Sequence, residues 1–154
     1  MAEDWKVYVF HPKYALSKCL DFEGGKTEDG TNLIIWDYHR SHNQRFQAIS
    51  VGNGYFTFKN LQTGKVIDET GGEVKNEVNI QMYSSNNTDA QKWKIIKEGG
   101  GYYSIQSKLN SNYYLDIQYA SNKNGANVIL YERMNSDNQK FKIIEKKYID
   151  IGLV

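Results

Sequence analysis

The sequence predicts an all-β protein built from three four-stranded repeats. Three observations support this class. One six-residue skeleton occurs three times along the 154 residues. Short runs of β-branched and aromatic residues are bounded by glycine-rich or polar turns, as in strands. The chain has one proline and 14% aromatic residues, which favours strands over helices. Such a repeat is typical of folds whose units bury their apolar faces against one another.

The skeleton starts with an Asp. An Asn, an aromatic residue, a Gln, a second aromatic residue and an Ile follow it at constant offsets of 11, 15, 23, 25 and 28. The three copies are Asp21, Asn32, Trp36, Gln44, Phe46 and Ile49; Asp68, Asn79, Tyr83, Gln91, Trp93 and Ile96; and Asp116, Asn127, Tyr131, Gln139, Phe141 and Ile144. We therefore expect one domain over residues 1–154, with repeats at about 6–51, 55–98 and 102–145 and a tail at 146–154.

Each repeat is expected to form four strands. These are predicted at 6–10, 18–22, 32–36 and 44–49, at 55–58, 65–68, 79–83 and 91–96, and at 102–105, 113–116, 127–131 and 139–144. Twelve strands in three equivalent units predict a β-trefoil with pseudo-threefold symmetry, which leaves few free edges. A three-bladed propeller is the alternative, although propellers usually have four or more blades. The apolar end of the tail is expected either to add an edge strand or to cover a subunit contact.

Composition narrows the function classes. The net charge of +1 favours neither nucleic acid nor an acidic membrane as a partner. No apolar run is long enough for a membrane span, and the start MAEDWK does not resemble a signal peptide. Cys19 is the only cysteine, so no internal disulfide can form, and we expect a buried thiol. These features predict a cytoplasmic protein or one secreted by a non-classical route.

The Gln-x-Phe/Trp element near the end of each repeat carries a family resemblance. Together with the matched Asp and the third-strand aromatic residue, it resembles the Q-x-W signature of ricin B-type lectin domains, over residues 6–144. Secreted members often close each repeat with a disulfide, whereas here Tyr38 stands where the partner of Cys19 would be. The chain therefore resembles the small disulfide-free lectins of this group.

Part of the skeleton is expected to be structural. A buried Gln can bridge backbone groups, and the aromatic residue two positions later can fill the core. Ile49, Ile96 and Ile144 are expected in the core as well. Asn32, Asn79 and Asn127 are expected to fix the turn into the third strand through side-chain to backbone bonds.

The remaining positions predict sugar binding. A carboxylate accepts two hydroxyl hydrogens, an aromatic ring covers the apolar face of a sugar, and an Asn amide both donates and accepts. In the family these groups occupy corresponding places in each repeat and favour galactose-type sugars. The resemblance assigns Asp21, Trp36, Asn43 and Gln44 to a first site, and Asp116, Tyr131, Asn138 and Gln139 to a third. The alternative for the Asp residues is a structural role, in which each caps the turn after its strand.

The second copy is expected to be weaker. It keeps Asp68, Tyr83 and Gln91, but Ala90 replaces the Asn of the other copies. Gln81, which corresponds to Ile34 and Ile129, can partly rescue this site or can mark a contact that the other two copies lack.

An enzyme is not expected. The three Asp residues should lie on separate lobes, whereas a catalytic carboxylate pair needs a separation of about 5–10 Å. His39 and His42 lie near Asp37 in a polar loop, where a solvated loop is favoured over a metal site because no second ligand cluster exists. No cofactor motif is present.

The sequence therefore predicts a multivalent, galactose-type lectin that binds glycans of glycoproteins or glycolipids and agglutinates cells as a haemagglutinin does. A homodimer would double its number of sites. The alternative is a β-trefoil interaction module, such as an inhibitor or the receptor-binding component of a toxin, which would bind proteins through loops at 37–42 or 84–89. An actin-binding trefoil is a third class.

Overall fold

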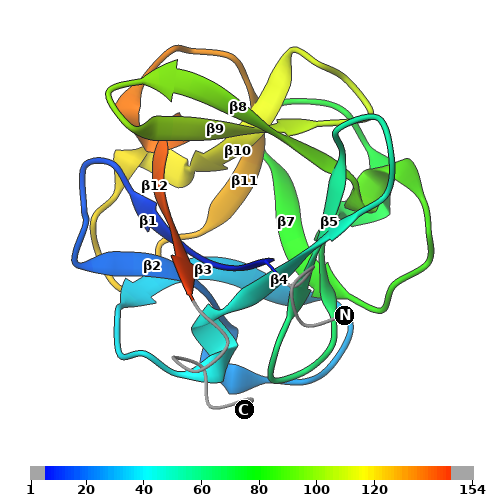
Figure 1. Cartoon of the computed structure of the whole chain (residues 1–154), viewed down its shortest axis with the longest axis horizontal. Helices are drawn as coiled ribbons and strands as arrows, with labels where there is room; N and C mark the ends of the chain where they lie inside the picture. The colour runs from blue at the N-terminus through cyan, green and yellow to red at the C-terminus, as the bar shows by residue number, and fades with distance from the viewer. Residues whose placement is uncertain (1–5, 147–154) are drawn as a thin grey trace.

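The structure is a computed structural model in which residues 6–146 are described, and they form twelve strands in three groups of four. Figure 1 shows the three groups arranged around a common centre. The strands are Lys6–Pro12 (β1), Lys18–Phe22 (β2), Thr31–Asp37 (β3), Phe46–Ser50 (β4), Phe56–Asn60 (β5), Val66–Glu69 (β6), Val78–Tyr83 (β7), Trp93–Gly99 (β8), Tyr102–Ser107 (β9), Tyr113–Ile117 (β10), Val128–Glu132 (β11) and Phe141–Lys146 (β12).

Six of these strands close into an antiparallel barrel. Its order is β1, β4, β5, β8, β9 and β12, and β12 pairs with β1 to complete the ring. The last pairing runs from Val7 opposite Lys146 to Pro12 opposite Phe141. A closed sheet has no free edge, so no strand of the barrel is left as a template for unwanted pairing.

The other six strands form one hairpin per repeat: β2 with β3, β6 with β7, and β10 with β11. The hairpins also join one another, because β7 pairs with both β3 and β11, and a bridge links Ile34 to Asn127. A closed barrel with three interlocked hairpins is a β-trefoil, as predicted, and it excludes the propeller.

The three skeleton asparagines connect the repeats. Asn79 Nδ2 donates to Asn32 Oδ1 at 2.6 Å, and Asn127 Nδ2 donates to Asn79 Oδ1 at 2.7 Å. We expected bonds to the backbone of each local turn. Instead, equivalent side chains of the three repeats bind one another where the hairpins meet.

The core is filled by the aromatic residue of each Gln-x-Phe/Trp element. Phe46, Trp93 and Phe141 have no exposed surface, and the indole nitrogen of Trp93 donates to the Ile67 carbonyl at 3.1 Å. Cys19 is buried, as expected, and burial raises the pKa of its thiol.

The prediction for the skeleton isoleucines was wrong for Ile49. Its side chain is 36% exposed, whereas Ala48, two residues after Phe46, is buried. Side chains three apart in a strand point to opposite faces, and those two apart share a face. Ile96 and Ile144 are half-buried, while Ile95 and Ile143, two residues after the core aromatic residue, pack against the core.

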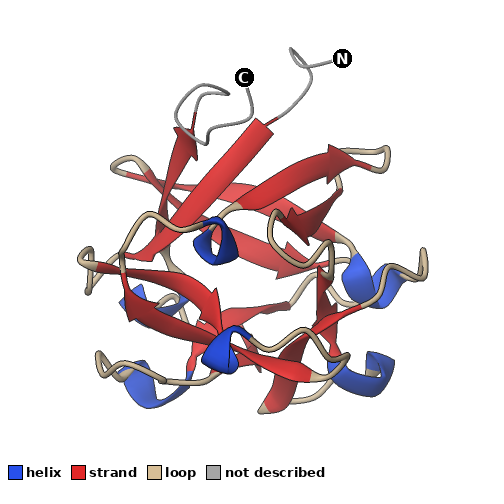
Figure 2. Cartoon of the chain, turned by 90° about the horizontal axis from the view of Figure 1, so that it is seen from below, coloured by secondary structure: helices blue, strands red, loops and turns tan. Residues whose placement is uncertain are grey.

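Short 3₁₀ turns connect many of the strands, and Figure 2 shows them on the outside of the sheet. They are Glu23–Gly25 (η2), His42–Gln44 (η3), Thr70–Gly72 (η4), Asp89–Gln91 (η5), Gln118–Ala120 (η6) and Asp137–Gln139 (η7). Each skeleton Gln ends such a turn, so the fourth strand of each repeat begins two residues later than predicted. In the described part of the chain, no helix is long and apolar enough to cross a membrane. The predicted edge strand in the tail lies outside the described residues.

Candidate functional site: three repeated surface pockets

Each repeat holds one surface pocket, lined by its skeleton Asp and by the aromatic residue of its third strand. The pairs are Asp21 and Trp36, Asp68 and Tyr83, and Asp116 and Tyr131, in cavities of about 180, 380 and 400 Å³ respectively. Asn43 lines the first pocket and Asn138 the third, while Ala90 lines the second. The structure therefore brings together the Asp, the ring and the Asn that the sequence singled out.

Strand register places the carboxylate beside the ring. Asp21 on β2 pairs with Ile34 on β3, and Trp36 lies two residues beyond Ile34. Residues two apart in a strand share a face, so Trp36 and Asp21 project from the same side of the hairpin. The same register places Asp116 opposite Ile129, two residues before Tyr131.

The rings are accessible to solvent. Trp36 is 40% exposed, Tyr83 is 37% exposed, and Tyr131 is half-buried. None of them is part of the core, so each ring offers a partly free face beside a carboxylate.

The skeleton glutamines fix the carboxylates. Gln139 Nε2 donates to Asp116 Oδ2 and to the Glu132 carbonyl, both at 2.9 Å, and Gln139 Oε1 accepts from the Met134 amide at 3.0 Å. Gln44 and Gln91 repeat this pattern with Asp21 and Asp68. Both amide hydrogens of each Gln are bound within the protein, so the Gln acts on the pocket by orienting the Asp.

The asparagines bind the other carboxylate oxygen. Asn43 Nδ2 donates to Asp21 Oδ1 at 2.7 Å, and Asn138 Nδ2 donates to Asp116 Oδ1 at 3.1 Å. Each Asn is itself held by a serine two residues earlier, because Ser41 and Ser136 donate to the Asn Oδ1. The orientation of the carboxylate is thus fixed from two sides.

In the second pocket a different residue supplies this bond. Gln81 Nε2 donates to Asp68 Oδ1 at 3.0 Å. Gln81 lies directly opposite Asp68 in the hairpin. The amide that Ala90 lacks is therefore provided by the neighbouring strand.

The electrostatics of the carboxylates differ between pockets. Burial raises the pKa of all three, and hydrogen bonds from the Gln and Asn side chains partly offset it. In Asp116 the pKa rises to about 6. Asp21 has additional stabilisation of its charged form, because the Phe22 amide donates to it at 2.7 Å and His39 Nε2 lies 3.6 Å from its Oδ2. The bond from the Phe22 amide to Asp21 is the kind that the turn-capping alternative predicts, whereas Asp68 and Asp116 accept hydrogen bonds from amide side chains.

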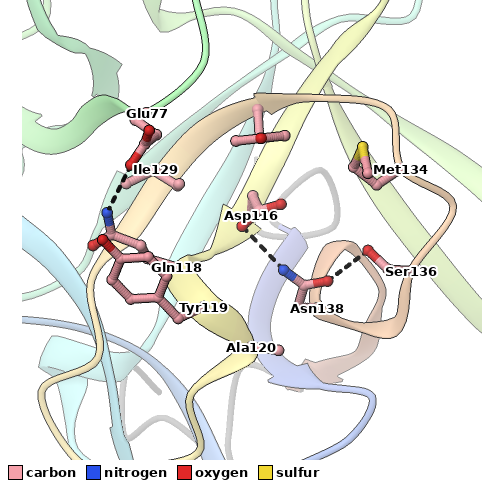
Figure 3. Close-up of a pocket in the computed structure, with 10 residues that line it drawn as sticks. Glu77, Asp116, Gln118, Tyr119, Ala120, Ile129, Met134, Ser136 and Asn138 are labelled. Atoms are coloured by element: carbon pink, nitrogen blue, oxygen red, sulfur yellow. Dashed lines mark hydrogen bonds between the residues drawn. The ribbon is translucent and has the colours of Figure 1, made fainter.

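Sequence reasoning missed several pocket residues. His39 lines the first pocket, although we considered it only as a loop or metal residue. Gln118, Tyr119 and Met134 line the third pocket, and Figure 3 shows Tyr119 and Met134 on opposite sides of Asp116. Alignment of the repeats could have found Tyr119, because the equivalent positions hold glycine. Within residues 6–146, no three His, Cys, Asp or Glu side chains are grouped to hold a metal ion.

Comparison with known structures supports the β-trefoil. A designed threefold-symmetric protein, ThreeFoil, is 31% identical, with a TM-score of 0.87 over 91% of this chain and 99% of its own. The agglutinin of Rhizoctonia solani is 23% identical, with a TM-score of 0.82 over 91% and 94% of the two chains. An exo-β-1,3-galactanase from Clostridium thermocellum is 24% identical, with a TM-score of 0.86, but the match covers 92% of this chain and only 30% of the galactanase.

A search of curated proteins found no significant match. A family model does match the sequence over residues 42–131, which is more than half of the chain, and its description is "Ricin-type beta-trefoil lectin domain-like". This match agrees with the three Gln-x-Phe/Trp elements and with the three repeated pockets. The chain therefore belongs to the ricin-type β-trefoil lectin family, and this membership supports carbohydrate binding in general.

Proposed function

We propose that residues 1–154 act as one non-catalytic lectin domain, which binds galactose- or N-acetylgalactosamine-type sugars through one pocket in each repeat. The observation that carries this proposal is the threefold recurrence of an oriented carboxylate beside a partly exposed ring. Burial of a carboxylate costs stability, and in each pocket amide side chains hold the buried carboxylate in one orientation beside the ring. A ligand that needs the carboxylate explains why the arrangement is repeated.

The chemistry of the pocket suits a sugar with vicinal hydroxyls on one edge. The Asp oxygens accept hydroxyl hydrogens through charge-assisted bonds. The ring offers an apolar surface to the C–H groups on the face of the sugar. We assign these roles to Asp21 and Trp36, to Asp68 and Tyr83, and to Asp116 and Tyr131. In our proposal, Asn43 and Asn138 contact the sugar or orient the Asp, while Gln44, Gln91 and Gln139 orient it alone.

Separate weak sites would act together. Shallow, wet pockets are expected to bind a monosaccharide with a dissociation constant of about 1 mM, equivalent to about 4 kcal/mol. Attachment of two or three pockets to one glycan-bearing surface raises the avidity without any new contact. Agglutination of cells follows from this multivalency, and a homodimer would double the number of sites.

Binding without hydrolysis is proposed because the skeleton carboxylates are distributed among the pockets. Glycoside hydrolysis uses two carboxyl groups about 5–10 Å apart on either side of the bond. Asp21, Asp68 and Asp116 each line a different cavity. The second cavity also has Glu69 and Asp89 on its lining, and the third has Glu77, so hydrolysis of nitrophenyl galactosides should be measured with the intact protein.

Titration of the ¹⁵N-labelled protein with galactose, followed by NMR, tests the proposal. We expect the indole N–H of Trp36 and the amides around Asp116 to shift together with sugar concentration. Trp36→Ala should abolish the response of the first pocket alone, and Tyr131→Ala that of the third alone. Each ring is partly exposed, so both variants should fold.

Asp137→Asn is the matched control. It alters an exposed carboxylate next to Asn138 that does not line the third pocket, so sugar binding should be unchanged. A glycan array with free lactose as competitor should then identify the preferred sugars. Absence of any shift with galactose, N-acetylgalactosamine or lactose would contradict the galactose-type assignment. A protein that bound other proteins but no glycan on the array would be an interaction module.

A further inference from the structure

The third pocket differs from the other two at a turn where the backbone is the same in all three repeats. The two residues three and four positions after the skeleton Asp have positive φ in every copy. The values are 60° and 63° at Gly24 and Gly25, 67° and 64° at Gly71 and Gly72, and 60° and 50° at Tyr119 and Ala120. The fold thus requires a left-handed turn here, and only the third repeat makes it without glycine.

A side chain in this conformation is strained. Glycine adopts positive φ at no steric cost, whereas a bulky residue there is an outlier. Strain of this kind is concentrated at functional sites, where the surrounding structure maintains it. Tyr119 therefore occupies a position at which glycine would make the protein more stable.

Packing does not explain the residue. Tyr119 is 85% exposed, the highest exposure of any large apolar side chain in the described part of the chain. Among those same residues, its side chain has no hydrogen bond, ion pair or ring contact with a partner. The ring instead lines the third cavity, where Figure 3 shows it at the side of Asp116 away from Met134.

Two polar side chains near Tyr119 connect the third pocket to the neighbouring repeat. Gln118 Nε2 lies 3.5 Å from Glu77 Oε1, and both residues line the same cavity as Asp116. The third cavity has about 400 Å³, compared with about 180 Å³ in the first. Beyond the carboxylate there is thus a second area with a ring, an amide and a carboxylate.

We propose that Tyr119, Gln118 and Glu77 form a second subsite beside the Asp116 pocket, which binds the next sugar unit of a neutral oligosaccharide. This proposal rests on the function proposed above. The Tyr119 ring would cover the apolar face of the second sugar, and Gln118 and Glu77 would bind its hydroxyls. Glu77 would disfavour an anionic sugar through like-charge repulsion. The third pocket is then the most selective of the three.

The test compares galactose with lactose in the third pocket by NMR titration, with the Trp36 indole signal as an internal report on the first pocket. In the wild-type protein we expect lactose to bind the third pocket about five- to tenfold more tightly than galactose, the range that aromatic contact with one more unit supplies. Tyr119→Gly, which restores the residue of the other repeats, should remove this difference. Galactose affinity should fall less than lactose affinity, and the melting temperature should rise by about 2–4 °C.

Tyr119→Phe is the matched variant, because it keeps the ring and the strain and should retain the preference for lactose. The proposal is overturned if Tyr119→Gly leaves the preference intact, or if it weakens galactose and lactose equally. A preference for N-acetylgalactosamine rather than lactose that depends on Tyr119 would overturn it as well, because the ring would then contact a substituent of the first sugar. Failure of the proposed function is distinguishable, since no pocket would then respond to either sugar.

Discussion

Gln81 Nε2 donates to Asp68 Oδ1 at 3.0 Å, and so makes the bond that Asn43 and Asn138 make in the other repeats. Gln81→Ile, which copies the residue of the other two hairpins, should remove it. One hydrogen bond to a charged group contributes about 1 kcal/mol or more, so we expect about fivefold weaker galactose binding in the second pocket. The pKa of Asp68 should also rise, which ¹³C NMR of its carboxyl group can measure.

A second substitution tests the compensation. Ala90→Asn, added to Gln81→Ile, recreates the pattern of the first and third repeats and should restore both the affinity and the pKa. If the double variant bound no better than Gln81→Ile, the two amides would not be equivalent.

Binding in the third pocket should depend on pH. Burial raises the pKa of Asp116 to about 6, and only the ionised carboxylate accepts two hydroxyl hydrogens. The charged form is therefore lost as the pH falls through about 6. At one pH unit below the pKa about a tenth is ionised, so galactose affinity should be about tenfold weaker at pH 5 than at pH 7.5.

The first pocket serves as the comparison in the same titration. Asp21 in this pocket accepts a hydrogen bond from the Phe22 amide, and His39 lies nearby. Both contacts favour the ionised form of the carboxylate. We expect its galactose affinity to persist to lower pH. Equal loss in both pockets would contradict the role assigned to the burial of Asp116.

Stability should fall as pH rises toward neutrality, because of Glu69. This side chain is buried beside Asp68 and Ser107. Burial and the charge of Asp68 raise its pKa to about 7, and the Ser107 side chain offsets this only in part. Since the folded state binds its proton more tightly than the unfolded state, the free energy of unfolding decreases between about pH 4.5 and pH 7. The raised pKa corresponds to a loss of about 3 kcal/mol above pH 7.

Glu69→Gln should remove this part of the pH dependence, because the amide does not ionise. Urea unfolding at pH 4.5 and pH 8 measures it. At pH 8 the variant should be more stable than the wild-type protein, and at pH 4.5 the two should be similar. In the remaining slope, the raised pKa values of Asp21, Asp68 and Asp116 act in the same direction as that of Glu69. The lowered pKa of His11 acts in the opposite direction. A variant as pH-dependent as the wild type would mean that Glu69 is solvated.

The asparagine bonds between hairpins should contribute unequally to stability. Asn79 makes two of them, one with Asn32 and one with Asn127. Asn79→Ala should therefore cost about 2 kcal/mol in the free energy of unfolding, and Asn32→Ala about 1 kcal/mol. Similar losses in both variants would show that the bonds are not independent.

The fold could be predicted because the same residue pattern occurs in each of the three repeats. Six matched positions in three copies predict how many repeats there are and which aromatic residues fill the core. The face of the strand on which a recurring residue lies was harder to predict from the sequence. Ile49 recurs in every repeat as Phe46 does, but it lies three residues after Phe46 and therefore on the opposite face of the strand. A residue that recurs in all three repeats is needed at that position, but its recurrence does not show whether the position is buried or exposed.

Prediction of the site succeeded for the same reason and failed where symmetry is broken. Asp, ring and Asn occupy equivalent places and could be grouped from the sequence. Tyr119 and Gln81 are departures from the repeat, and their significance depends on backbone dihedral angles and on which residue lies across the hairpin. Neither property is visible in a skeleton of shared residues, although alignment of the copies marks both positions.

The pairing of β1 with β12 has a consequence for biosynthesis. During translation, β1 is synthesised more than a hundred residues before its partner β12. Strand β9, which also pairs with β12, is likewise synthesised before it. Until then the nascent chain exposes strand edges that can pair with neighbouring polypeptides. Contacts this distant along the chain also form slowly. Ring closure is therefore a late event in folding, and a chain terminated before Phe141 would lack the strand that closes the barrel.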